Sequence, residues 1–170
     1  MTSNIKVTLV LLVTFLIAPL VLASGPDIHA LWDDRCVSCH GHAGEFARKF
    51  LTVSNAELQG RHHVHDLRLF LQNHYLAGHS VEPVYNMLRA QAGNDPRFTN
   101  ECSRCHNRAA DFVRDSFILR DGVLYSRQLD MPIREFLNGH RKLQQQDVDY
   151  FMQQLMRIAN EVDLNNTNSK

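Results

Sequence analysis

Apolar side chains recur along the chain at the spacing of amphipathic helices. The pattern i, i+3, i+4, i+7 occurs twice, at Leu67, Phe70, Leu71 and His74 and again at Ile133, Phe136, Leu137 and His140. Another apolar stripe predicts a terminal helix over residues 146–160, and residues 80–92 are expected to form its counterpart earlier in the chain. The strand signal is limited to a short hairpin around Asp121-Gly122. The pattern therefore predicts an all-α fold.

The first residues show a different pattern. A polar start with Lys6 is followed by apolar residues from Val7 to Leu22, and small residues follow at Ala23 and Ser24. This order is typical of a secretory signal peptide, with cleavage expected after Ala23. The alternative is an uncleaved membrane anchor, but the run is shorter than the roughly 20 residues that span a bilayer. Residues 1–23 are therefore interpreted as an export signal.

The rest of the chain repeats itself. A shift of 66 residues, without a gap, places Cys36, Cys39 and His40 on Cys102, Cys105 and His106. The same shift superposes further residues in each half, among them Ala43, Phe46, Arg48, Leu58, Arg61, Arg68, Phe70, Leu71 and His74. A fixed offset indicates a duplicated unit, so the two halves are expected to fold alike.

The repeat defines the domain organisation. We expect one helical lobe over residues 24–92, a second over 93–164, and a loose polar tail over 165–170. Asp27 is expected to cap a short helix that leads into the first cysteine motif, and Pro96 to begin the matching segment. Units this small rarely build an adequate core unaided. A large apolar cofactor would supply the missing core.

The cysteines stand in two C-x-x-C-H motifs, Cys36-Cys39-His40 and Cys102-Cys105-His106. This spacing is the signature of covalent c-type haem attachment. Two thiols one helical turn apart can bond the two vinyl groups, and the adjacent histidine can then reach the iron. Two motifs in register predict two haem c groups, with His40 and His106 as the proximal iron ligands.

Other uses of four cysteines were weighed. In an exported protein they first suggest two disulfides. A zinc site built from all four would leave the paired histidines unexplained. Thiol redox chemistry of the C-x-x-C type is usually accompanied by a βαβ pattern, which is missing from the sequence. Haem attachment accounts for more of the pattern than any of these.

From about Asp27 to Ala159 the chain resembles small dihaem c-type cytochromes made of two cytochrome c-like lobes. The resemblance rests on the two C-x-x-C-H motifs, on the aromatic residue four positions before each, and on the repeated downstream histidine. It implies that each lobe has an N-terminal helix leading into the motif and a C-terminal helix packing across it.

The sixth iron ligand decides between electron transfer and chemistry at the iron. The methionines do not repeat at the 66-residue offset, whereas His74 and His140 do, each 34 residues after its proximal histidine. We therefore expect bis-histidine ligation by His74 and His140. His62, His63, His65 and His79 compete with His74 in the first half. Arg61 and Arg127 are candidate partners for the haem propionates, because a guanidinium matches carboxylate geometry.

Charge and motif content narrow the range of possible functions. Removing residues 1–23 leaves 17 basic and 18 acidic side chains, which indicates no nucleic-acid partner. No nucleophile or paired carboxylates stand out. The sequence favours a periplasmic dihaem electron carrier that works with redox partner proteins and meets the membrane only if residues 1–23 are retained. The alternative is a dihaem oxidoreductase, of the peroxidase or small sulfur-compound oxidising type, with one open haem. A haem-based sensor is a weaker third option.

Overall fold

The structure is a computed structural model that describes residues 25–61 and 66–164. The expected export signal, the expected tail over 165–170, and His62, His63 and His65 lie outside the described residues. No helix within the described ranges is long and apolar enough to cross a membrane.

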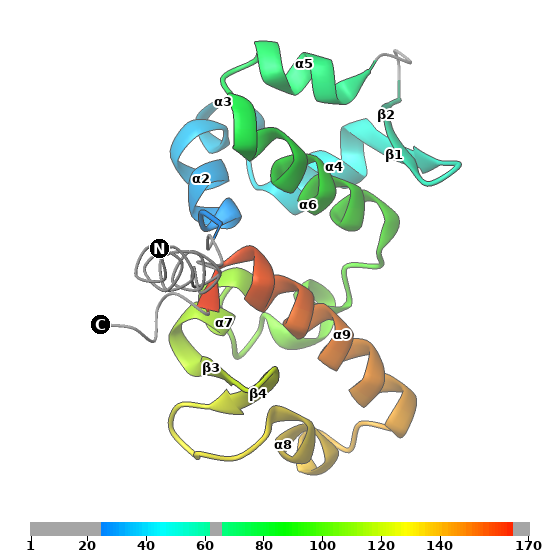
Figure 1. Cartoon of the computed structure of the whole chain (residues 1–170). Coiled ribbons are helices and arrows are strands. Elements are labelled where there is room, and N and C mark those ends of the chain that lie inside the picture. The colour runs from blue at the N-terminus through cyan, green and yellow to red at the C-terminus, as the bar shows by residue number, and fades with distance from the viewer. Residues whose placement is uncertain (1–24, 62–65, 165–170) are drawn as a thin grey trace, which may run out of the picture.

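The first half of the chain runs from α2 to α6. Its elements, in order, are α2 (Ile28–Arg35), α3 (Val37–His40), α4 (Ala43–Phe50), β1 (Leu51–Ser54), β2 (Glu57–Gly60), α5 (Leu67–Asn73), the 3₁₀ turn η1 (Gly78–Ser80) and α6 (Val81–Gly93). In Figure 1 this half is coloured blue to green, and α6 passes in front of α4 and below α5, in contact with both.

The second half repeats this order. Its elements are the π-helical turn η2 (Phe98–Cys102), α7 (Ala109–Ser116), β3 (Phe117–Arg120), β4 (Val123–Ser126), α8 (Ile133–Gly139) and α9 (Gln145–Glu161). The bounds of α7, β3, β4 and α8 are those of α4, β1, β2 and α5 shifted by 66 residues. The expectation that the halves fold alike is confirmed for these elements. The entry to the second motif differs, because η2 stands where α2 would repeat.

Local sequence explains where these helices begin. The carboxylate of Asp27 accepts a hydrogen bond from the Ala30 amide at 2.8 Å and caps α2, as predicted. Pro83 lies in the first turn of α6, where its missing N–H costs no helical hydrogen bond. Gln144 and Asp147 form a reciprocal capping box at the start of α9. The helices predicted over 80–92 and 146–160 are thus confirmed, as α6 and α9.

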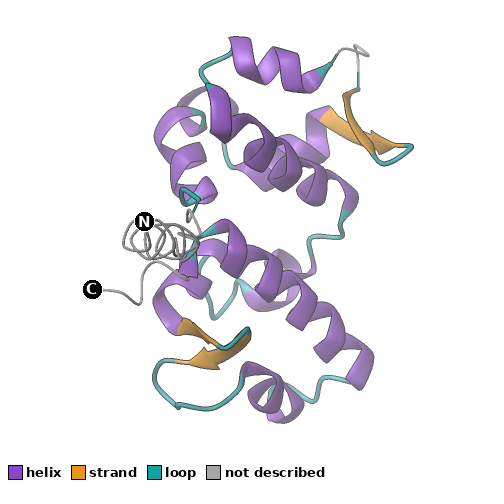
Figure 2. Cartoon of the chain, in the orientation of Figure 1, coloured by secondary structure: helices purple, strands orange, loops and turns teal. Residues whose placement is uncertain are grey.

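The all-α prediction is wrong. Within the described residues, β1 pairs with β2 and β3 with β4, giving one two-stranded antiparallel sheet in each half (Figure 2). Both turns need two consecutive residues in the left-handed region: Asn55 and Ala56 at φ 50° and 63°, and Asp121 and Gly122 at 49° and 76°. The Asp-Gly pair is a strong signal for such a turn, and this hairpin was predicted. The Asn-Ala pair is not such a signal, so the first hairpin was not predicted.

Each half has its own hydrophobic core. In the first, buried side chains from α2, α4, the hairpin, α5 and α6 form one cluster that includes Trp32, Leu58 and Tyr85. In the second, α7, its hairpin, α8 and α9 form another that includes Leu124 and Phe151. Leu58 and Leu124 occupy equivalent positions and are 3% and 0% exposed. The terminal helix of each half therefore packs on the helix after the motif and on the helix before the distal histidine: α6 on α4 and α5, and α9 on α7 and α8.

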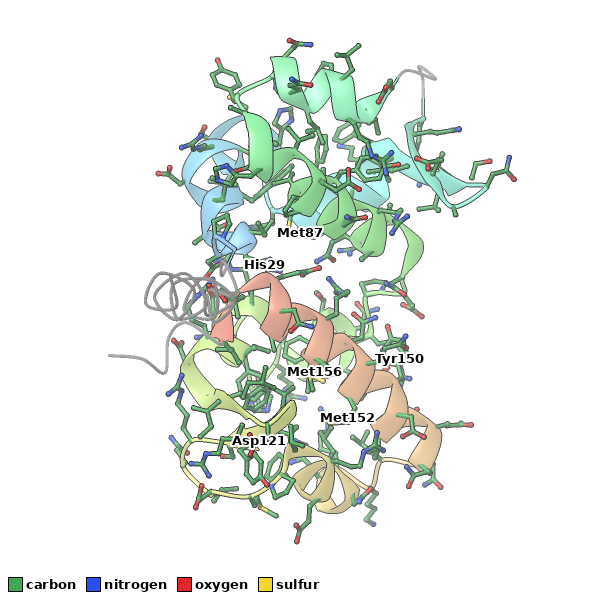
Figure 3. The ribbon with its side chains drawn as sticks, in the orientation of Figure 1. His29, Met87, Asp121, Tyr150, Met152 and Met156 are labelled. Carbon is green, nitrogen blue, oxygen red and sulfur yellow. The ribbon has the colours of Figure 1, made fainter. Side chains whose placement is uncertain are left out.

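Polar bridges join the two halves. Arg108 at the start of α7 pairs with Asp33 of α2 at 2.7 Å, and Arg114 of α7 pairs with Asp27 at 2.8 Å. His29 of α2 lies 2.8 Å from Glu161 at the end of α9. Figure 3 shows His29 at this junction, on the side of α2 that faces α9. Helix α2 therefore fixes the first half onto α7 and α9.

Candidate haem sites

Each C-x-x-C-H motif occupies a single helical turn. The amides of Cys39 and His40 both donate to the Cys36 carbonyl, at 3.2 and 2.9 Å. The second motif repeats this geometry, with its Cys105 and His106 amides donating to the Cys102 carbonyl at 3.1 and 3.0 Å. Both cysteines of each motif therefore lie on one turn, with the histidine directly after them.

All four cysteines are free thiols, so the structure does not contain the two disulfides considered as an alternative. Cys36 and Cys102 are half-buried against the cores of their own halves. Burial is the main cause that raises the pKa of both thiols. A raised pKa keeps a thiol protonated, whereas thiol redox catalysis depends on the thiolate. Among the described residues no group of three or more His, Cys, Asp or Glu side chains is placed to hold a metal ion.

The proximal histidines are each held against an aromatic ring. His40 meets Phe46 of α4 with ring centroids 4.7 Å apart, and His106 meets Phe112 of α7 at 4.1 Å. Burial lowers the pKa of both imidazoles, and the neighbouring distal histidine adds to the effect. A lowered pKa favours the neutral imidazole, which is the form that binds a metal.

The distal candidates end equivalent helices. His74 follows α5 and His140 follows α8, and each amide donates to the carbonyl three residues earlier at 3.1 Å. Each imidazole stacks on the aromatic ring four residues before it. The Phe70–His74 and Phe136–His140 centroids are both 4.8 Å apart, with interplanar angles of 22° and 28°. This stack limits how far either imidazole can turn.

The imidazoles of each half lie close together, with interplanar angles of 63° for His40 and His74 and 54° for His106 and His140. The His40 and His74 centroids are 5.8 Å apart, and the His106 and His140 centroids are 6.1 Å apart. If each ring nitrogen lies about 2.0–2.1 Å from a shared metal, as in zinc–histidine sites, and each ring centre about 1.1 Å further back, two opposed imidazoles have centroids about 6.3 Å apart. The observed spacing in both halves is close to that value, so the four histidines fit two iron atoms with one ligand on each side.

The arginines expected to bind propionates have different surroundings. The Arg61 guanidinium donates to the carbonyls of Leu51 and Arg48, at 3.2 and 2.6 Å, and so caps the end of α4. Arg127 is exposed, and its side chain has no partner among the described residues. Their roles toward propionates remain predictions.

A cavity of about 320 Å³ lies between the halves, and of the four paired histidines only His106 lines it. Its lining includes Trp32, His42 and His106, but none of His40, His74 and His140. The Trp32 indole donates to the Gly41 carbonyl at 3.0 Å, which holds the chain just after the first motif. Met87 of α6 is fully buried, and Met152 and Met156 on α9 pack against the second core (Figure 3).

Comparison of the chain with protein-family models, with curated proteins and with solved structures found no match. The site is therefore characterised by its own geometry. Arg141 was not among the expected site residues, yet its side chain contacts the segment that carries the second motif. The repeat gave no signal for it, because Tyr75 stands at the equivalent position.

Proposed function

We propose that the chain is an exported dihaem c-type cytochrome that transfers electrons between redox partner proteins. The observation that carries the proposal is the close pairing of histidines, His40 with His74 and His106 with His140, at nearly the same spacing in both halves. Each pair adjoins two free cysteines on one helical turn. A thiol pair with an adjacent histidine is the set that attaches a haem covalently.

When bound, a haem supplies one-electron redox chemistry, and the protein sets its ligands and surroundings. Cys36 and Cys39 would hold one haem through thioether bonds, and Cys102 and Cys105 the other. His40 and His74 would bind the first iron from its two sides, and His106 and His140 the second. Ligation by two histidines would leave neither iron with a free position for a substrate. This arrangement favours electron transfer over catalysis at the iron.

The aromatic residues of each site have a supporting role. Phe46 and Phe112 hold the proximal rings, while Phe70 and Phe136 stack on the distal rings. Phe70 is 52% exposed in the present structure, and Phe50 beside Phe46 is 42% exposed. A macrocycle seated between the two imidazoles would cover apolar surface of this kind. That burial would stabilise each half.

Expression of the full chain in a bacterial host that matures c-type cytochromes tests the proposal. Intact mass should show two added haems, and Cys36→Ala/Cys39→Ala and Cys102→Ala/Cys105→Ala should each remove one. Optical spectra should be low-spin and unchanged by carbon monoxide or cyanide. A full-length product without haem would overturn the proposal. Ready ligand binding at one haem would favour the oxidoreductase alternative.

A further inference from the structure

The two candidate sites share their ligands and stacking partners but differ at the residue after each distal histidine. That residue is Tyr75 in the first half and Arg141 in the second. Both have left-handed backbones, with φ 61° and 57°, although in the second half Lys142 is left-handed as well, at φ 55°. The two sites therefore differ in the side chain that follows the histidine, at turns that begin alike.

Arg141 reaches from the distal loop to the proximal segment. Its Nη1 donates a hydrogen bond to the carbonyl of Glu101, the residue directly before Cys102. The guanidinium is therefore held beside the second motif.

Tyr75 brings no charge to the first site. Its ring meets His74 edge-on with centroids 5.1 Å apart, and the side chain is 78% exposed. Two kinds of charge lie near Cys102 besides Arg141. Arg104, inside the motif where the first half has Ser38, is exposed and has no hydrogen bond or ion pair among the described residues, so it is not held in place as Arg141 is. The others are paired. Arg97 bonds Glu101 at 2.6 Å and Asp147 at 2.9 Å. Arg141 is the cation at the second site that bonds a main-chain carbonyl and no carboxylate.

We propose that Arg141 raises the reduction potential of the haem held by His106 and His140, and so biases the electron toward the second site. The inference rests on the proposed function. Reduction lowers the charge of the iron by one, so a nearby fixed cation stabilises the reduced form relative to the oxidised form. Because Arg141 is exposed, added salt should weaken the effect.

Spectroelectrochemical titration of the dihaem protein tests this role. Arg141→Gln keeps an N–H donor for the Glu101 carbonyl and removes the charge. We expect it to lower one of the two reduction potentials by about 59 mV, which for a one-electron couple is a tenfold fall in the reduced-to-oxidised ratio. Arg141→Lys should restore most of the shift. Tyr75→Arg should raise the other potential.

Arg120→Gln is the matched control, because it removes a cation that pairs with Asp130 in the hairpin, away from His106. It should move neither potential. The proposal is overturned if Arg141→Gln moves neither reduction potential. It is also overturned if Arg141→Lys lowers the potential as far as Arg141→Gln does, or if the haems of Arg141→Gln are no longer low-spin. The last result would make Arg141 a structural anchor. Wild-type protein without covalent haem would instead overturn the proposed function, and the inference with it.

Discussion

The two halves reach the same geometry at their histidine pairs by different local means. In the first, the loop after the distal histidine is anchored by Leu76, which is 5% exposed in the core. In the second, Lys142 is exposed at that position, and Arg141 ties the loop to Glu101 instead. Helix α5 is held by Arg68 against Glu57 and Glu82, whereas in α8 Arg134 pairs with Asp149. The repeated parts are the paired histidines and the aromatic rings packed on them, whereas the contacts that support them differ between the halves.

Removing a distal ligand should have the largest effect and should break the equivalence of the halves. We expect His74→Ala and His140→Ala each to convert one of the two haems from low-spin to high-spin, because each iron loses one imidazole while its partner site keeps both. Cyanide should then bind one haem per chain, measured by optical titration. A fully low-spin spectrum in either variant would refute that histidine as a ligand.

Truncating equivalent core leucines compares the two hairpins. Leu58→Ala and Leu124→Ala should each lower the free energy of unfolding by about 2–5 kcal/mol, since both positions are buried. Urea unfolding followed by haem absorbance and by Trp32 fluorescence is the measurement. Trp32 belongs to the first core, so Leu58→Ala should shift its transition more than Leu124→Ala does. Equal shifts would mean that the halves unfold as one unit.

The junction between the halves should respond to pH. Burial alone would raise the pKa of Glu161, but the hydrogen bond from His29 and the charge of Arg157 lower it below its ordinary value of 4.5. The ionised carboxylate therefore stabilises the fold at neutral pH, and this stabilisation is lost as pH falls below about 4.5. Glu161→Gln should cost about 1–3 kcal/mol at pH 7 in urea unfolding and progressively less at acid pH. A cost that does not change with pH would contradict this assignment.

The turns of the two hairpins give the smallest expected effect. Ala56 adopts φ 63° without the freedom of glycine, while Gly122 holds the equivalent position at φ 76°. Ala56→Gly should stabilise the protein and Gly122→Ala should destabilise it, each by about 1 kcal/mol. Thermal unfolding of both variants is sufficient. Changes of the same sign would show that the turns are not equivalent.

Much of the architecture could be predicted from residue patterns. The apolar stripes predicted the two helices that end directly before His74 and His140, and Asp121-Gly122 predicted the second hairpin. The first hairpin was missed because Asn55-Ala56 lacks a glycine, and the packing of Leu51 and Leu58 decides its formation instead. The repeat also led us to expect an ordinary helix before the second motif, where the chain forms the π-helical turn η2.

The contacts between the halves could not be predicted from the repeat, because they occur where the repeat is broken. Asp33 and Arg108 form one bridge, and their equivalents in the other half are Thr99 and His42. Asp27 pairs with Arg114, but the residue equivalent to Asp27 is Gly93. In the first bridge both partners differ from their equivalents, whereas in the second only Asp27 does, because Arg114 is repeated as Arg48. The residues that match between the halves therefore could not predict these contacts.

The same bridges bear on whether a further copy of the repeated half could pack against the second half in the same way. Contacts between unlike surfaces can in principle continue head to tail without closing, as in solenoid arrays. Here the second half has Gly93 and Thr99 where the first presents the carboxylates of Asp27 and Asp33. A third copy of the unit, offering the arginines of α7, would find no acceptor there. The residues that join the two halves therefore cannot form the same bridges to a further copy placed after the second half.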